Sequence, residues 1–116
     1  MTNIERLQLE AKGITLTPDE LSVYLAEEGI TDPNTEYDAS SSTAKRKIYS
    51  AALAILNSIA NNPTLMKSYK QDDITVSEFA DSLQNRIDQL ERKIRTMTIN
   101  GSDNDNGSNT FMLFGN

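Results

Sequence analysis

Residues 44–62, "AKRKIYSAALAILNSIANN", decide the fold of this 116-residue chain. The alanines and the leucine between its larger aliphatic residues make several sides of the stretch apolar, and a helix that is apolar on several sides is buried on several sides. We therefore predict a helix over 43–61 that either forms the centre of the domain or faces a neighbouring subunit. The side chains at the spacing of one helical face are Ile48, Ala52, Ile55, Leu56 and Ile59.

Two shorter helices are predicted ahead of this one. The first covers 3–12, where aliphatic residues recur at helical spacing. The second begins at a capping box, because Thr17 is followed three residues later by Glu20, with Pro18 at the first helical position. Gly29 is the expected end of the second helix.

The connecting segments on either side of the central helix differ in character. Residues 31–43 form a loop in which Tyr37 is expected to hold the loop against the domain. Residues 63–77 suggest a helical turn followed by two short extended pieces, "KSYK" and "ITV", which would pair as a small hairpin or tongue over 67–75. Two strands alone are marginal in water, so this tongue requires a partner surface. Its candidate contact residues are Tyr69, Ile74 and Val76.

A long helix is predicted over 76–97, with a second capping box formed by Thr75 and Glu78. Its apolar residues follow a near-heptad spacing and leave a charged opposite face. The resulting seam could form a coiled-coil dimer, but packing against the central helix of the same chain is the favoured interpretation. The seam consists of Phe79, Leu83, Ile87, Leu90, Ile94 and Met97.

The composition changes after Met97. Residues 98–110 are rich in Gly, Ser, Asn and Asp and predict a polar linker of about 40 Å when extended. An apolar tip, "TFMLFGN", follows, and it could be a free tail, fold back on its own domain or dock on another subunit. Docking is favoured because an exposed apolar tail promotes aggregation and the linker exceeds what folding back needs. The tip residues are Phe111, Met112, Leu113 and Phe114.

These elements predict a mainly α protein. We expect a small bundle of about four helices with a short extended hairpin or tongue and an extended C-terminal arm. The helical domain would occupy 1–97 and the arm 98–116.

The composition narrows the possible functions. The chain has no Cys, His or Trp, which removes Ser-His-Asp triads, thiolate nucleophiles and Cys/His zinc sites. Its carboxylates are explained by helix starts and turns, and "DNDNGS" (103–108) lacks the Gly and Glu spacing of an EF-hand calcium loop. We therefore predict no catalytic residues, no metal, no cofactor and no enzymatic activity. No stretch is long and apolar enough for a membrane span or a signal peptide, so a cytosol-like compartment is expected.

One basic cluster stands out in this acidic chain. Lys45, Arg46 and Lys47 lie near the start of the central helix, where the helix dipole disfavours cations. They are interpreted mainly as solvated side chains, with an acidic protein partner or nucleic-acid phosphates as the alternatives. A net charge of −6 argues against broad binding of a phosphate backbone.

The segment 51–94 resembles the head-to-tail connector (adaptor or neck) proteins of tailed bacteriophages. The shared features are an Ala-rich helix ending in Ile59-Ala60-x-x-Pro63, a Leu-Met-Lys turn at 65–67, and "DITVS" at 73–77 leading into a long closing helix. Upstream, "LTPDELSVYLAEEGI" (16–30) resembles the opening helix of that family, so the likeness covers about 14–97.

This resemblance implies a virion structural protein. Such subunits assemble as a ring, commonly dodecameric, on the portal; they extend the DNA channel and give the stopper or tail protein a platform. The tongue and the terminal arm would contact neighbouring subunits and the portal, and DNA would pass without specific binding. The protein would then be made in the host cytoplasm and reside in the virion neck. The alternative is a small helical regulatory or adaptor module of a phage or bacterium, associated with DNA through 45–47.

Overall fold

The computed structural model describes residues 1–70 and 73–106, and for 98–106 it describes the backbone only. Within these residues the chain forms five helices: α1 (Asn3–Glu10), α2 (Pro18–Glu27), α3 (Ser42–Ala60), α4 (Pro63–Tyr69) and α5 (Val76–Asn106). A single antiparallel bridge joins Thr2 to Glu36, and this described part contains no strand. The predicted mainly α class is confirmed.

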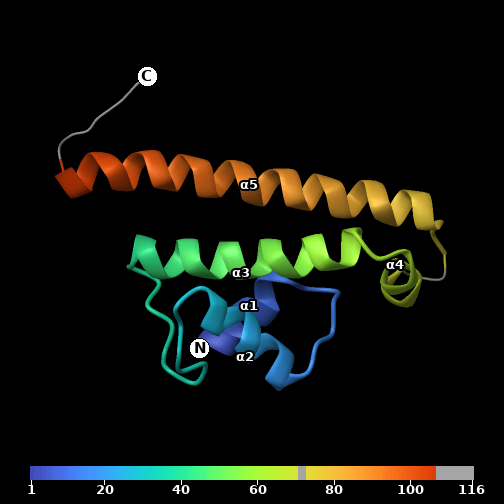
Figure 1. Ribbon diagram of the computed structural model, residues 1–116, viewed down its shortest axis with the longest axis horizontal. Helices are drawn as coiled ribbons and strands as arrows, with labels where there is room; N and C mark the ends of the chain where they lie inside the picture. Colours follow the sequence, from blue (N-terminus) through green and yellow to red (C-terminus); the bar gives the residue numbers. More distant parts are fainter. Residues whose placement is uncertain (71–72, 107–116) are drawn as a thin grey trace.

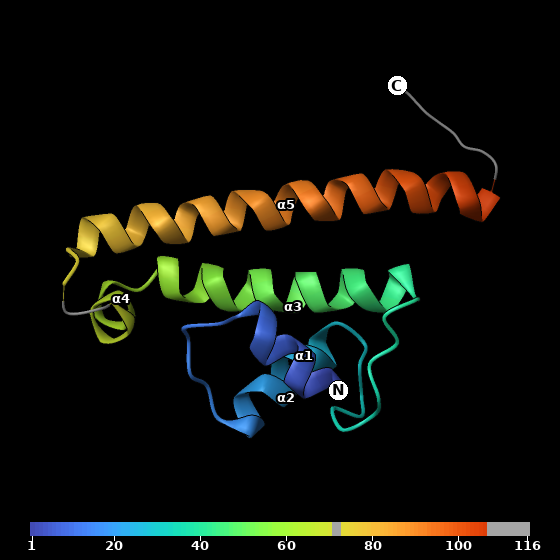
Figure 2. The ribbon, with the colours of Figure 1, turned by 180° about the vertical axis from the view of Figure 1, so that it is seen from behind.

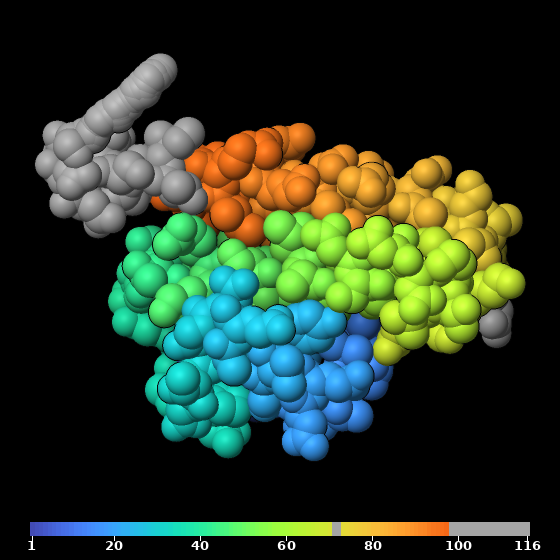
Figure 3. All heavy atoms as spheres, viewed as in Figure 1, coloured from blue at the N-terminus to red at the C-terminus, as the bar shows by residue number. Residues whose placement is uncertain are grey.

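Helix α3 is the middle layer of the bundle. Figures 1 and 2 show α5 running antiparallel along one side of α3, while α1 and α2 cover the opposite side. The short α4 lies at the turn between α3 and α5, and α3 contacts each of the other four helices. The space-filling view shows α3 exposed as a band between α5 and the α1–α2 layer (Figure 3). The first of the two predicted positions, a central helix, is therefore the one observed.

The core confirms the predicted faces. All five aliphatic residues that defined the face of α3 are buried, and so is Ala51. Leu7, Leu21 and Leu25 meet them from the α1–α2 layer, and the middle of the α5 seam (Leu83, Ile87 and Leu90) meets them from the other side. The seam therefore packs within the chain, which was the favoured interpretation.

The predicted helix starts are formed by the expected bonds. In both capping boxes the threonine hydroxyl accepts from the glutamate N–H, and the glutamate carboxylate accepts from the threonine N–H. The distances are 3.2 and 2.9 Å for Thr17 and Glu20, and 3.0 and 2.8 Å for Thr75 and Glu78. Gly29 ends α2 at φ +88°, a conformation that a residue with a Cβ rarely adopts.

The predicted hairpin is wrong. "KSY" (67–69) belongs to α4, a helix that begins at Pro63 and is capped by Asn62. The Asn62 side chain accepts from the N–H groups of Thr64 and Leu65, at 3.0 and 3.2 Å. An N-cap followed by proline at the first position fixes a helical start, and this local chemistry outweighs the alternating pattern that suggested strands. Within 73–76 the chain turns directly into α5.

Helix α5 also extends beyond its predicted end. It continues from Met97 to Asn106, so nine residues that were assigned to a polar linker are helical. Once a helix is formed, each further residue adds a backbone hydrogen bond without a new nucleation cost, which favours continuation even through polar sequence. None of the described helices combines the length and the apolar composition that crossing a bilayer requires.

Candidate interaction surface

The predicted contact residues of the tongue lie at the end of the bundle where α4 leads into α5. Tyr69 ends α4 half-buried against the core, and its hydroxyl donates to the Thr15 carbonyl at 3.0 Å. Val76 is the first residue of α5 and is half-buried, as is Ile74 just before it. Tyr69 therefore fastens α4 to the loop after α1, and its hydroxyl is already engaged within the domain.

The apolar tip lies outside the described residues. The prediction that Phe111, Met112, Leu113 and Phe114 dock on a partner remains a prediction. The structure changes the reach of this tip, however. Because α5 runs to Asn106, only about 17 Å of extended chain separates that residue from Phe111, counted over five Cα steps.

The basic cluster does not form one patch. The Lys47 ammonium lies 3.5 Å from the point where a Cβ on Gly29 would sit, at the C-terminal end of α2. A cation at a helix C-terminus is favourable, so α2 offsets the unfavourable position of Lys47 in the first turns of α3. Arg46 is exposed and lines one hollow together with Lys47, Glu28 and Ser50, so two of the three cations stay together. Lys45 faces elsewhere, toward α5.

An open groove lies between the N-terminal half of α3 and the C-terminal half of α5, and Lys45 is on its edge. Its volume is about 530 Å³, within the range of ligand sites in proteins. In Figure 3 the first turns of α3 lie directly beside the part of α5 that supplies the other wall. We call this the α3–α5 groove; its lining residues are Ser42, Lys45, Tyr49, Arg92, Lys93, Thr96 and Met97.

The α3–α5 groove combines an apolar surface with positive charge. Its exposed surface is mainly apolar, supplied by the Tyr49 ring, Met97 and the hydrocarbon stems of the long side chains. Three of its lining residues are cationic (Lys45, Arg92 and Lys93), and none carries a carboxylate. An apolar segment flanked by acidic residues is the kind of ligand that such a groove fits.

Tyr49 is held between two cations. The Lys93 ammonium lies 5.3 Å from the centre of its ring, and the Arg6 guanidinium lies 5.9 Å from it. Arg6 also lies 5.4 Å from the Tyr37 ring. Cations within about 6 Å of an aromatic ring are attracted to its face, so these contacts restrict the orientation of Tyr49 in the lining of the groove. The predicted anchoring of the 31–43 loop by Tyr37 is confirmed, since Tyr37 packs against the core.

Arg6 is fixed in turn by Glu10. Its Nη1 donates to Glu10 Oε1 at 3.0 Å in a partly buried pair. Burial is the largest single influence and opposes the charge of Arg6, but the hydrogen bonds and electrostatic attraction from Glu10 and Tyr37 together outweigh it, so the pKa of Arg6 lies above its ordinary value. Arg6 therefore stays protonated beside both tyrosines. Sequence analysis did not predict this cluster, because the positions that meet are far apart along the chain.

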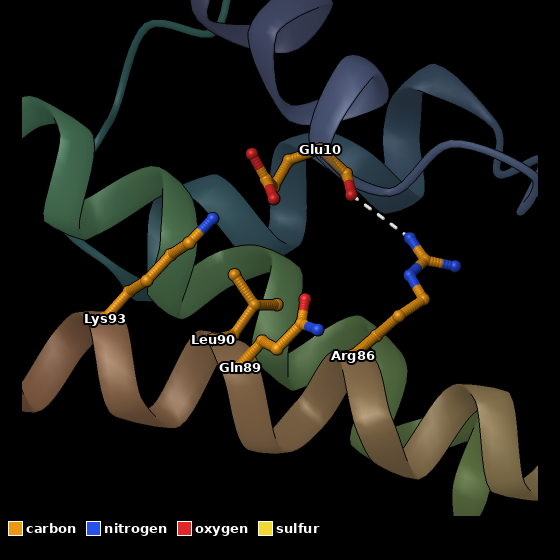
Figure 4. A pocket seen from close by; sticks show the side chains of 5 residues that line it. All are labelled: Glu10, Arg86, Gln89, Leu90 and Lys93. Carbon is orange, nitrogen blue, oxygen red and sulfur yellow. Dashed lines mark hydrogen bonds between the residues drawn. The ribbon is translucent and has the colours of Figure 1, made fainter.

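Glu10 also connects α1 to α5. Figure 4 shows Arg86 reaching from α5 to the end of α1, where its Nη2 donates to the Glu10 carbonyl at 3.2 Å. The pocket beside this bond measures about 60 Å³, and Gln89, Leu90 and Lys93 complete its lining. It is too small for an organic ligand and serves as a junction between the two outer layers.

Comparison with known proteins gives no relative for this chain. No protein-family model, curated protein or solved structure matches it significantly. Within residues 1–70 and 73–97 there is also no group of three or more acidic side chains placed to hold a metal ion. The function is therefore argued from the bundle, the α3–α5 groove and the sequence.

Proposed function

We propose that this chain is a non-enzymatic structural subunit of the head-to-tail connector of a tailed phage. In this proposal it assembles as a ring, commonly dodecameric, on the portal protein. The ring extends the DNA channel and provides the platform on which the stopper or tail attaches. The subunit would then reside in the neck of the virion and pass DNA without binding it specifically.

The observation that carries the proposal is the unequal length of the two antiparallel helices. Helix α5 has 31 residues and α3 has 19, so α5 is longer by about 18 Å at 1.5 Å per residue. Among the residues of α5 up to Met97, whose side chains the structure describes, the last buried one is Leu90. A bundle in which one helix continues well beyond the partner helix, with an apolar tip further along the chain, suits a subunit that joins copies of itself.

The resemblance to connector proteins supports the same proposal. Its helical features fall on real elements: Ile59 and Ala60 end α3, Pro63 begins α4, and 73–77 lead into α5. The extended tongue expected from the resemblance is not formed in the described part of 67–75. The proposal accordingly rests on the helices and the arm.

The test is the assembly state. Native mass spectrometry and negative-stain electron microscopy of the full-length chain, alone and with the portal protein from the same phage, should show closed rings. A chain that stays monomeric with the portal present would contradict the connector proposal.

A second candidate, association with DNA, is favoured by the three cations on the α3–α5 groove. A gel-shift series in increasing salt would show binding whose salt slope falls by about one per cation removed. The variant Lys45→Ala/Arg92→Ala/Lys93→Ala should then lose most of the binding, whereas Arg46→Ala/Lys47→Ala should lose less. The net charge of −6 opposes this function and leaves it second.

A further inference from the structure

We infer that the α3–α5 groove is the receptor for the apolar tip of a second copy of this chain. The inference deepens the proposed function and relies on it only for self-association. One copy contributes the seven residues that line the groove. The other copy contributes residues 103–114, which contain the apolar tip and two aspartates.

The first argument is complementary composition. The lining of the groove combines Tyr49 and Met97 with the cationic side chains of Lys45, Arg92 and Lys93. Phe111 to Phe114 supply four consecutive apolar side chains, and Asp103 and Asp105 precede them with no Lys or Arg between 103 and 114. Aromatic side chains also interact favourably with Lys and Arg, so both the apolar and the charged parts of the groove find partners.

The length of chain between α5 and the tip favours a contact between two copies over a contact within one. Lys93, which lies over Tyr49, is 13 residues before Asn106, or about 20 Å back along α5. The extended chain from Asn106 to Phe111 covers only about 17 Å. In its own subunit Phe111 falls short of Tyr49 even with the connection fully stretched. The later tip residues, up to Phe114 at about 27 Å, extend that far only if the whole segment is drawn out and reverses direction after Asn106, which leaves little slack and disfavours the contact within one subunit. The tip of another copy has no such limit.

The third argument is that Tyr49 is preorganised. Its ring is held by Lys93 and Arg6, and Arg6 is held by Glu10. A receptor whose lining is already ordered loses less conformational entropy when a ligand binds. The tip supplies a head-to-tail contact, in which one surface of a copy meets a different surface of the next, and such contacts close into rings when the rotation permits.

The test uses full-length chains altered at either side of the contact. The tip variant is Phe111→Ser/Met112→Ser/Leu113→Ser/Phe114→Ser, and the groove variant is Lys45→Glu/Arg92→Glu. Lys12→Glu/Lys67→Glu is the matched control, because it makes the same charge change at two exposed lysines outside the groove. Circular dichroism and thermal melts should show that all four chains, wild type included, are folded.

Sedimentation velocity should show self-association of the wild type and of the control, and monomers for both the tip variant and the groove variant. Mixing the two monomeric variants should restore a one-to-one pair, because one supplies a tip and the other a groove. A labelled peptide of residues 103–116 should bind the tip variant saturably. The Lys45→Glu/Arg92→Glu change should weaken this binding roughly tenfold in about 0.05 M salt, and less in about 0.5 M salt, where charges are screened.

Three results would overturn the inference. The peptide could bind equally with and without the groove changes, the mixed variants could stay monomeric, or the wild type could be a monomer whose tip contacts its own groove. Failure of this contact is distinguishable from failure of the connector proposal. Rings that form equally well from the groove variant would refute the contact alone, whereas one-to-one pairing without any ring on the portal would refute the connector alone.

Discussion

Leu56 lies in the C-terminal half of α3 with no exposed surface and belongs to the core that the layers share. Leu56→Ala should lower the free energy of unfolding by about 3 kcal/mol, since it removes buried methyl groups and leaves a cavity. Urea unfolding followed by circular dichroism measures this change. Val23→Ala is the control, because Val23 is 56% exposed and its replacement should shift stability by less than about 0.5 kcal/mol. Equal midpoints for the two variants would contradict the described core.

Glu5 gives the fold a dependence on pH. Its carboxylate accepts from the Thr2 N–H at 2.7 Å, and this bond lowers the pKa of Glu5 below its ordinary value of 4.5. A carboxyl whose pKa is lowered by folding stabilises the folded state above its unfolded pKa, and this contribution is lost as the pH falls through the folded pKa. Glu5→Gln should therefore lose less stability than the wild type between pH 7 and pH values below 4.5. Thermal melts of both proteins over that range measure the effect. A melting temperature that falls equally with pH in the two proteins would contradict a stabilising role of the Glu5 carboxylate.

At the residue scale, the contacts that could be predicted from the sequence are those between residues close together along the chain. Thr17 with Glu20, and Thr75 with Glu78, are three residues apart, so their bonds follow from spacing alone. The stacking of Arg6 on Tyr49 joins residues 43 positions apart and depends on how α1 packs beside α3. Such contacts become predictable only when the packing of the helices is known.

At the scale of the element, the capping box at the start of α2 allows the contribution of one local interaction to stability to be measured. Thr17→Ala removes the hydroxyl that accepts from the Glu20 N–H, and it should destabilise the protein by about 1 kcal/mol. Thr15→Ala is a matched control, because Thr15 is exposed and contributes its carbonyl, which alanine retains, to the bond with Tyr69. Urea midpoints that move equally in both variants would show that the capping box adds no stability.

The two errors in element prediction have a common physical origin. The segment after Pro63 is short, so its pattern fits two strands as well as two helical turns, and packing decides between them. Leu65 and Met66 belong to the predicted helical turn, and the helix continues through Tyr69 instead of changing to a strand at Lys67, so all three residues pack against the core. The end of α5 was misplaced for a related reason, because polar composition and Gly101 favour a linker but do not forbid a helix that has already formed.

At the scale of the whole molecule, α3 makes one cooperative unit of three layers. Its apolar residues on several sides predicted a helix that is either central or in contact with a neighbouring subunit, and the first of these is observed; that α1 and α2 cover one side and α5 the other was not predicted. The pattern of apolar residues could not predict the α3–α5 groove. A groove forms where the side chains of two particular helices do not fill the space between them, and this depends on how the helices pack. Its lining residues come from two separated segments and are mostly of the kind expected on a solvated face.

The length of α5 links the shape of the molecule to its assembly, and Gly101 offers a matched pair of variants. Gly101→Pro should end α5 before that position and reduce helicity at 222 nm, whereas Gly101→Ala should increase it, since proline costs about 3 kcal/mol in a helix interior and glycine about 1 kcal/mol relative to alanine. Both variants should keep the urea midpoint of the wild type, because Leu90 is the last buried residue in the part of α5, up to Met97, whose side chains the structure describes.

The two Gly101 variants also distinguish the effect of how far the tip can reach from the effect of its composition. Ending α5 early lengthens the connection to Phe111, so the whole tip of Gly101→Pro can reach the groove of its own subunit without a fully stretched connection. The variant should then self-associate less than Gly101→Ala in sedimentation velocity, although both retain every residue of the groove and of the tip. Equal association would mean that the helical extension does not direct the tip toward a second copy. A lowered urea midpoint in Gly101→Pro alone would place the turns beyond Met97 within the cooperative core.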